Sequence, residues 1–317
     1  MDDTGRYSRR YPVIFCSILQ RHKKRSRRKM SYTRKQFLQL SRGALGALAL
    51  SPLVNNFQLD DESRKLITFG LQLYSIRDIF EKDPKGALKL IAGFGYKQLE
   101  GYERAPGIFW GMKNTEFKKY VDDLGMSFIS THCEIDSGFE KKADEAAAIG
   151  MKYLIYNWPF SQQPMDEYRK KAEAFNKCGE ICRKAGIGFA YHNYQSSFQL
   201  VDGVYPHDVL MKEADSDLVH HQMDIYWVVA AGANPEEWLK KYPGRFRLCH
   251  IKDRVKGSIK EEDTCDLGTG SIDFPSILKT ARKNGMQYYI AEQEHYPNST
   301  QLKSAEANAE YMRKLKI

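Results

Sequence analysis

Three short apolar runs that end in ionisable residues constrain the fold of this chain more than any other feature. They are residues 223–227 (MDIYW), 248–253 (LCHIKD) and 288–294 (YYIAEQE). A buried parallel strand whose last residues face an active site has this pattern. Asp224 and His250 lie 26 positions apart, a reasonable length for one strand–helix–loop unit. We therefore expect Asp224, His250 and Glu292 to converge on one point, where a divalent cation is the natural occupant.

The same unit of apolar run, turn and helical segment recurs between residues 66 and 317. Strands are expected at 67–74, 97–100, 126–131, 152–156, 187–191, 221–225, 246–251 and 287–291. The segments between them are predicted helices, several of which end at a glycine such as Gly125 or Gly186. No Gly-x-Gly-x-x-Gly motif follows the first strand. The pattern therefore favours an α/β fold of the (β/α)₈ TIM-barrel type, in one domain, over a doubly wound sheet.

The formal net charge of +9 is concentrated near the N-terminus. Ten Lys and Arg against Asp2 and Asp3 give residues 1–29 a net charge of +8, and three more basic residues follow before residue 59. The remainder, residues 59–317, is therefore close to −2. This composition gives no electrostatic reason to expect a nucleic acid as partner.

Residues 1–58 are predicted to be a basic leader, and Met30 is a candidate for the true start of the protein. Residues 33–38 (TRKQFL) and the short apolar core at 43–50 resemble a twin-arginine export signal, although Lys35 stands where the second Arg is expected. The core is too short to span a membrane by itself, so no stable membrane anchor is expected. The prediction is a periplasmic protein, with a cytoplasmic location as the alternative and a disordered or amphipathic leader as the other interpretation.

Ionisable residues recur at the ends of the expected strands. They are Glu100, His132, His192, Asp224, His250 and Glu292. In a (β/α)₈ barrel the carboxyl ends of the strands form the active site, whereas a helix surface would scatter such residues. The repetition therefore predicts one shared site.

Seven motifs in this order connect the chain to a known family. They are residues 70–75 (GLQLYS), 190–193 (AYHN), 223–227 (MDIYW), 231–235 (AGANP), 250–253 (HIKD), 268–274 (GTGSIDF) and 292–294 (EQE). Together they resemble the sugar phosphate isomerase/epimerase family of the xylose-isomerase-like TIM barrel superfamily. The resemblance covers residues 66 to about 315.

The resemblance implies a divalent metal, Mn, Zn, Mg or Co, held by residues from four successive strands. Asp224, His250 and Glu292 match the positions on strands six, seven and eight. Strand five departs from the family pattern, because Ser197 stands where a Glu is expected. Three outcomes follow: His192 or a water completes the metal shell, the metal binds weakly, or the protein catalyses another reaction.

The mechanism that the resemblance implies is proton abstraction next to a carbonyl group, with the metal stabilising the enediolate. Glu292 is the best carboxylate for the catalytic base, and Glu100, His132 and His192 are the other candidates. Predicted substrate contacts are Lys252 and Asp253, which would flank the metal, and the flat faces of Tyr74, Trp158 and Trp227.

These features predict a metal-dependent sugar isomerase or epimerase that acts on a non-phosphorylated sugar or keto-sugar. One alternative is a 3-keto-glycoside lyase that uses the same proton abstraction for β-elimination. Another is a non-catalytic sugar-binding barrel, which the departure at Ser197 motivates. The expected partner is a small carbohydrate, and a homo-oligomer is left open.

Overall fold

A computed structural model describes residues 66–317, except 67, 159–160, 259, 261 and 297–298. The predicted leader, including Met30 and residues 33–38, lies outside the described residues. Within the described part, no helix is long and apolar enough to cross a lipid bilayer.

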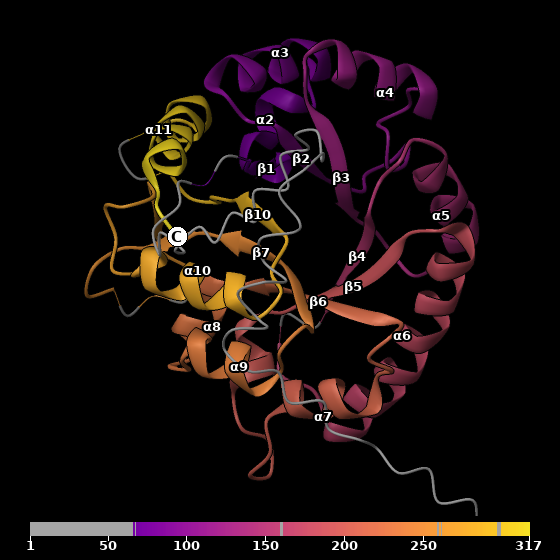
Figure 1. The fold of residues 1–317 in the computed structure, drawn as a ribbon, viewed down its shortest axis with the longest axis vertical. Coiled ribbons are helices and arrows are strands. Elements are labelled where there is room, and N and C mark those ends of the chain that lie inside the picture. Colours follow the sequence, from indigo (N-terminus) through magenta and orange to yellow (C-terminus); the bar gives the residue numbers. More distant parts are fainter. Residues whose placement is uncertain (1–65, 67, 159–160, 259, 261, 297–298) are drawn as a thin grey trace, which may run out of the picture. The chain divides into compact units, whose positions relative to one another are not determined.

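In the described chain, eight parallel strands close into a barrel (Figure 1). They are β1 (Gly70–Gln72), β2 (Gln98–Tyr102), β3 (Ser127–His132), β4 (Tyr153–Asn157), β5 (Gly188–His192), β6 (Val219–Asp224), β7 (Phe246–Ile251) and β10 (Tyr288–Ala291). Neighbours in sequence pair with each other, and β10 closes the ring by pairing with both β7 and β1. The predicted (β/α)₈ barrel is therefore confirmed.

Helices surround the barrel and form its outer layer (Figure 1). They are α2 (Arg77–Phe80), α3 (Pro84–Phe94), α4 (Asn114–Asp123), α5 (Phe139–Ala148), α6 (Met165–Ala185), α7 (Pro206–Glu213), α8 (Ile225–Ala230), α9 (Pro235–Lys241), α10 (Phe274–Lys283) and α11 (Gln301–Lys314), with 3₁₀ turns at η1 (Leu73–Ile76) and η2 (Gln195–Phe198). Side-chain caps fix several starts: the Asp83 carboxylate accepts a hydrogen bond from the Gly86 N–H, and the Asn234 side chain accepts one from the Glu236 N–H.

The structure differs from the expected elements around residues 225 and 253. Strand β6 ends at Asp224, because the Asp224 carboxylate accepts a hydrogen bond from the Trp227 N–H (3.3 Å) and caps helix α8. After β7, the chain forms the antiparallel pair β8 (Asp253–Arg254) and β9 (Thr264–Cys265), which the sequence pattern did not predict.

Side chains alternate between the barrel interior and the helix layer along each strand. On β6, Gln222 reaches across the interior to Glu100 of β2, whereas His221 packs against His207 of α7 with ring centroids 5.1 Å apart. The interior near the amino ends of the strands is an apolar cluster of Tyr153, Ile155, Ala190 and Leu248. Polar inward residues follow toward the carboxyl ends, where the site lies.

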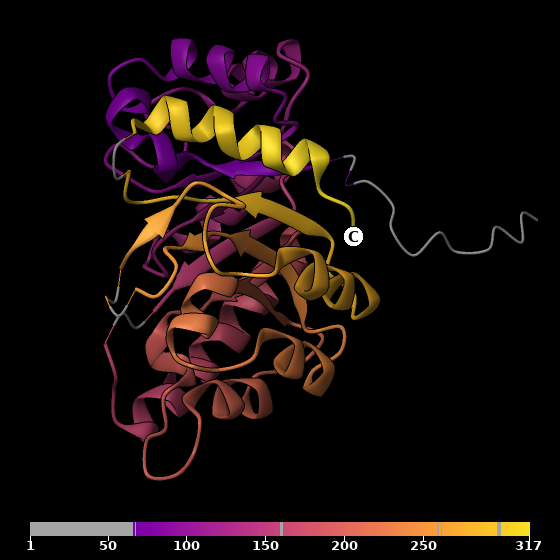
Figure 2. The ribbon, with the colours of Figure 1, turned by 90° about the vertical axis from the view of Figure 1, so that its left-hand side faces the viewer.

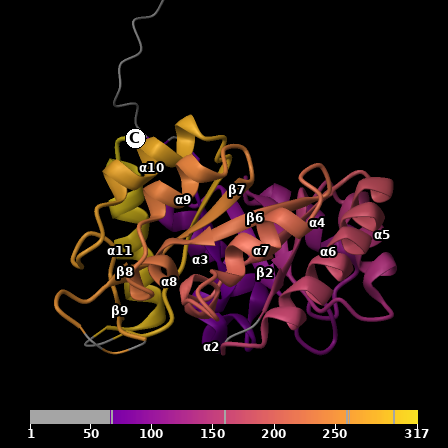
Figure 3. The ribbon, with the colours of Figure 1, turned by 90° about the horizontal axis from the view of Figure 1, so that it is seen from below.

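Packing between helices fixes the ring of the outer layer. Helix α11 lies against α3, so the end of the described chain packs beside its beginning (Figure 2). The Tyr96 hydroxyl donates to the Ala305 carbonyl at 2.8 Å, and the Leu66 N–H donates to the Leu315 carbonyl at 3.1 Å. Elsewhere in the layer, α6 and α7 lie side by side (Figure 3). The strand ends that carry the polar residues are thus held on a closed scaffold.

Candidate metal and sugar site

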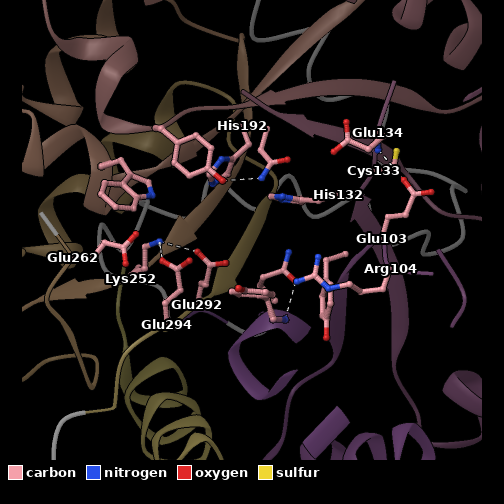
Figure 4. Close-up of a pocket in the computed structure, with 16 residues that line it drawn as sticks. Glu103, Arg104, His132, Cys133, Glu134, His192, Lys252, Glu262, Glu292 and Glu294 are labelled. Carbon is pink, nitrogen blue, oxygen red and sulfur yellow. Dashed lines mark hydrogen bonds and ion pairs between the residues drawn. The ribbon is translucent and has the colours of Figure 1, made fainter. Parts of the chain in front are cut away.

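A pocket of about 410 Å³ opens at the carboxyl ends of the strands (Figure 4). Six residues predicted from the sequence line it: Tyr74, His132, His192, Trp227, Lys252 and Glu292. In Figure 4, His132 and His192 lie on one side of the pocket, and Lys252, Glu292 and Glu294 gather on another. The strand ends therefore share one opening, as the repeated pattern indicated.

Donor atoms of three strand-end residues converge at the base of this pocket. His192 Nε2 lies 3.2 Å from His250 Nδ1, and both nitrogens lie near Asp224 Oδ2, at 3.6 and 3.7 Å respectively. Adjacent strands produce this arrangement, because Asp224 and His250 are direct partners across β6 and β7. All three side chains are buried. The cluster therefore offers two imidazole nitrogens and one carboxylate oxygen to a single point.

Glu292 reaches the same cluster from the end of β10. Its Oε2 lies 3.0 Å from His250 Nδ1 and 3.0 Å from the Lys252 ammonium. Burial would raise the pKa of Glu292, but His250 and Lys252 hold this pKa below its usual value. Glu294 has the same strand parity and also contacts Lys252 (2.7 Å). In the contacts found within the described chain, Glu292 and not Glu294 touches the histidine, so Glu292 is the residue after β10 that belongs to the cluster.

Lys252 is a buried ammonium held by three carboxylates. Its Nζ lies 2.9 Å from Asp224, 3.0 Å from Glu292 and 2.7 Å from Glu294. Burial would lower the pKa of Lys252, but these carboxylates raise it well above its usual value. Lys252 thus carries a fixed positive charge at the wall of the pocket.

The donor set fits a divalent cation. Two ligands of a tetrahedral ion with bonds of 2.0–2.2 Å are about 3.4 Å apart, and the separations among His192, Asp224 and His250 are 3.2, 3.6 and 3.7 Å. Asp224 Oδ2 is buried and lies 2.9 Å from the Lys252 ammonium, so a bound cation would share this oxygen with Lys252. Burial lowers the pKa of His192 to about 4, so this imidazole is neutral at pH 7, as a metal ligand requires.

Glu100 lies beneath the cluster and orients two histidines. Its Oε1 is 2.5 Å from His250 Nε2 and 3.1 Å from His132 Nε2, and it also accepts hydrogen bonds from Gln72, Ser130 and Gln222. Burial would raise the pKa of Glu100, but His250 and His132 hold it well below its usual value. A carboxylate on Nε2 leaves Nδ1 of the same ring to face the cluster, the arrangement common around metal-bound histidines.

Two of the predicted substrate contacts lie elsewhere. The Asp253 carboxylate accepts hydrogen bonds from the backbone N–H groups of Gly268, Gly270 and Ile272, so it anchors the loop after β9 and does not line the pocket. Trp158 packs on Tyr168 with ring centroids 5.3 Å apart, also outside the pocket lining. Neither side chain therefore lies in the pocket lining, and their role as substrate contacts stays a prediction. Asp253 follows Lys252 and Trp158 follows Asn157, both of which line the pocket. Because side chains alternate along a strand, Asp253 and Trp158 point away from the pocket.

Ser197 stands where the family pattern has a Glu after strand five, and it lies away from the cluster. Its hydroxyl pairs with the Tyr191 hydroxyl at 2.6 Å and is fully buried on the helix side of the barrel. The Ser197 hydroxyl therefore does not face the cluster. His192, the last residue of β5, occupies the strand-five place in the site instead.

Sequence reasoning missed several polar residues of the site. Gln72 and Gln222 hold Glu100, and Arg104, Asn157 and Tyr194 line the pocket. The two glutamines precede Tyr74 and Asp224 by two positions, so the period of a strand would have placed them inward. Arg104 lies in a loop and carries no such signal.

Comparison with known proteins places this architecture in a family. The family model of the xylose isomerase-like TIM barrel matches residues 88–315, which is more than half of the chain. The chain belongs to the xylose isomerase-like TIM barrel family. A solved sugar phosphate isomerase/epimerase from Parabacteroides distasonis ATCC 8503 is 30% identical, with a TM-score of 0.66 over 78% of this chain and 93% of that chain. The resemblance inferred from the motifs is therefore confirmed.

This chain is also similar to a dehydratase in sequence and to a zinc-binding protein in fold. An inosose dehydratase from Clostridium botulinum (strain Alaska E43 / Type E3) is 29% identical over 140 residues, which cover 39% of this chain and 46% of that protein. The chain thus matches about half the length of this relative. The solved IolI protein with a binding zinc atom has a TM-score of 0.64 at 16% identity, over 78% of this chain and 97% of that chain, and shows the shared fold alone.

Proposed function

We propose that this protein is a metal-dependent enzyme that removes a proton next to the carbonyl group of a non-phosphorylated sugar or keto-sugar. The observation that carries the proposal is the convergence of His192, Asp224 and His250 at the base of a polar pocket, with Glu292 beside them. The outcome we favour is isomerisation or epimerisation, which agrees with the Parabacteroides relative.

His192, Asp224, His250 and Glu292 would hold the cation. A bound divalent cation supplies Lewis-acid polarisation of a substrate carbonyl, which makes the neighbouring carbon–hydrogen bond more acidic. Glu100, Asp224, Glu292 and Glu294 place four carboxyl groups around His250 and Lys252, and a cation bound at His250 Nδ1 would replace the proton that these carboxylates hold on that ring in the metal-free protein. A barrel of the same fold, the IolI protein, has a binding zinc atom, which agrees with a metal in this protein, while the identity of the metal is open among Mn, Zn, Mg and Co.

The side chains around the cluster can hold a sugar. The Lys252 ammonium faces three carboxylates that hold it in place, so it contributes a fixed positive charge to the pocket wall near the substrate oxygens. Tyr74 and Trp227 contribute aromatic rings to the pocket lining, and Tyr74, which is only partly buried, can contact a sugar ring. These residues would fix the orientation of the carbonyl group while a base acts on the adjacent carbon.

The charges in the pocket favour an uncharged substrate. Its lining contains five carboxylic acids, Glu103, Glu134, Glu262, Glu292 and Glu294, against Arg104 and Lys252. Lys252 is already paired, and Arg104 lies 3.6 Å from Glu81. A phosphate group would therefore meet carboxylates without a free partner of opposite charge, which opposes binding. This supports a free sugar or keto-sugar over a sugar phosphate.

A second outcome starts with the same proton abstraction. If the substrate has a leaving group on the next carbon, the enolate expels it, and the reaction is an elimination. The similarity to inosose dehydratases favours loss of water, and the predicted 3-keto-glycoside lyase is the variant in which an aglycone leaves. Export to the periplasm and a homo-oligomeric state stay predictions from the sequence.

Hydrogen exchange at carbon tests the proposal. The purified protein is loaded in turn with Mn²⁺, Zn²⁺, Co²⁺ or Mg²⁺ and incubated in D₂O with inosose, 3-keto-glucose or free aldoses. We expect deuterium at the carbon next to the carbonyl with at least one metal, and its loss when EDTA removes the metal. If sugars bind but neither exchange nor new product forms with any metal, the protein is a sugar-binding barrel and the enzymatic proposal fails.

A further inference from the structure

His132 is the last residue of β3, and it differs from its neighbours in how its ring is held. Its side chain is 12% exposed and lines the pocket, above the fully buried Glu100. Its ring lies parallel to that of His250, with centroids 5.5 Å apart and an interplanar angle of 4°. Its Nε2 points down to Glu100 Oε1 (3.1 Å) and Gln222 Oε1 (2.9 Å).

The hydrogen-bond network fixes which ring nitrogen of His132 carries the proton. The Glu100 carboxylate can only accept, so the Gln222 amide nitrogen faces it at 2.7 Å. The Gln222 carbonyl oxygen is then the atom that faces His132, and it also can only accept. Two acceptors therefore require a proton on His132 Nε2. In the neutral ring, the lone pair lies on Nδ1.

Nδ1 of His132 is open to the pocket. Within the described residues no hydrogen bond to this nitrogen is found, and it is not among the buried polar atoms that lack a partner. His192 shows the opposite arrangement, because its Nδ1 is buried without a partner and its Nε2 faces His250 and Asp224. Of these two histidines, His132 is thus the one with an accessible ring nitrogen whose lone pair is fixed by the hydrogen bonds of the other nitrogen.

The two remaining candidates for the base, Glu100 and Glu292, are already engaged in other contacts. Glu100 is fully buried and already accepts hydrogen bonds from both sides of the barrel. Glu292 is held by His250 and Lys252 and belongs to the donor cluster. A group that serves as ligand and base at once would have to give up one contact to make the other.

We propose that His132 Nδ1 is the base that takes the proton from the carbon next to the substrate carbonyl, an assignment that rests on the proposed function. The carbon–hydrogen bond breaks, its electron pair forms the carbon–carbon double bond of the enolate, and the proton moves to Nδ1. The resulting imidazolium donates through Nε2–H to Glu100 and Gln222, so the Glu100 carboxylate stabilises its charge. In D₂O the transferred proton exchanges with solvent before one returns to carbon.

The variant His132→Gln separates this role from a structural one. A glutamine amide can still donate to Glu100 and Gln222, but it has no basic nitrogen. The matched control is His220→Gln, which lies at the other end of the barrel beside Tyr153 (ring centroids 5.7 Å). We expect His132→Gln to slow deuterium exchange by about 10²–10⁴-fold, with Mn²⁺ binding and melting temperature as in wild type. His220→Gln should exchange at the wild-type rate.

A rescue experiment completes the test. Exchange lost in His132→Gly should be restored in part by free imidazole, which a purely structural histidine would not allow. Exchange by His132→Gln at the wild-type rate would overturn the assignment, as would loss of exchange together with loss of Mn²⁺ binding and no imidazole rescue. If wild-type protein exchanges no substrate with any metal, the proposed function itself fails, and the role of His132 fails with it.

Discussion

The protein contains two groups of buried histidines with opposite surroundings. His192 and His250 lie inside the barrel against Asp224, and His250 also faces Glu100 and Glu292. His207 and His221 lie between the barrel and helix α7, among aromatic rings. His207 stacks on Phe198 (4.6 Å between centroids) and on Phe246 (5.6 Å). Neither of its ring nitrogens has a hydrogen-bond partner among the described residues.

The difference shows that carboxylates, rather than burial, distinguish a site histidine. Burial disfavours the charged imidazole in both groups. In the outer group burial prevails: it lowers the pKa of His207 to about 3 and that of His221 well below its usual value. At His250 the carboxylates of Glu292 and Glu100 overcome burial and raise the pKa well above its usual value. His192 lies between these cases, with a pKa lowered to about 4 by burial.

The largest expected effect comes from replacing the site histidine by a ring that cannot carry charge. His250→Phe leaves the buried carboxylates of Glu100 and Glu292 without their histidine partner. We expect a loss of about 3–5 kcal/mol in the free energy of unfolding of the metal-free protein at pH 7, measured by urea denaturation in the presence of EDTA. A loss below about 1 kcal/mol would show that His250 is not charged between these carboxylates.

The same substitution in the outer group should act in the opposite direction. Because the pKa of His207 is about 3 when folded and about 6.5 when unfolded, the unfolded chain binds more protons between these values, and stability falls as the pH falls. His207→Phe removes this loss of stability at low pH, because phenylalanine binds no proton. We therefore compare the free energy of unfolding of the variant with that of wild type at each pH. This difference should favour the variant by about 2 kcal/mol more at pH 5 than at pH 8. Equal gains at both pH values would contradict the buried, unpaired state of His207.

Glu100→Gln tests the carboxylate beneath the site. Without the negative charge, His250 loses the partner that directs Nδ1 toward the donor cluster. We expect affinity for Mn²⁺ or Zn²⁺ to fall by about 10–100-fold in calorimetric titrations. Glu103→Gln is the control, because Glu103 pairs with Lys142 (2.8 Å) on the pocket rim and should leave metal affinity as it is. Equal metal affinities in both variants would show that Glu100 does not orient His250 for metal binding.

The smallest effect is expected at a histidine that belongs to neither group. The His295 side chain is 48% exposed and lies 3.3 Å from Glu262. His295→Phe should change the free energy of unfolding by no more than about 0.5 kcal/mol in the same urea experiment. A larger change would mean that exposure does not separate this histidine from the two buried groups.

Strand period explains which parts of the site could be predicted. Asp224, His250 and Glu292 each end an apolar run, so the repeated strand–helix unit alone is enough to place them at one end of the barrel. The same period would have turned Asp253 and Trp158 away from the pocket, because each follows an inward residue. Applying it to every residue near a strand end would have placed both side chains outside the pocket lining.

Other features had no signal in the sequence. Gln222 reaches Glu100 across the barrel from a strand four units away, and such a contact depends on barrel closure rather than on neighbouring residues. Parity could not separate Glu292 from Glu294, and only the contact to His250 distinguishes them. The fold and the convergence of these strand-end residues were thus predictable, whereas the contacts of Glu100 and His132 required the three-dimensional structure.

The central claim is that His192, Asp224 and His250 bind one divalent cation together with Glu292. The most direct test is an anomalous-difference map from crystals of the protein grown with Mn²⁺ or Zn²⁺, with Asp224→Asn crystals as the comparison. We predict one peak within bonding distance of His192 Nε2, Asp224 Oδ2 and His250 Nδ1, and none there in Asp224→Asn. Wild-type crystals with no peak at this point would contradict the account.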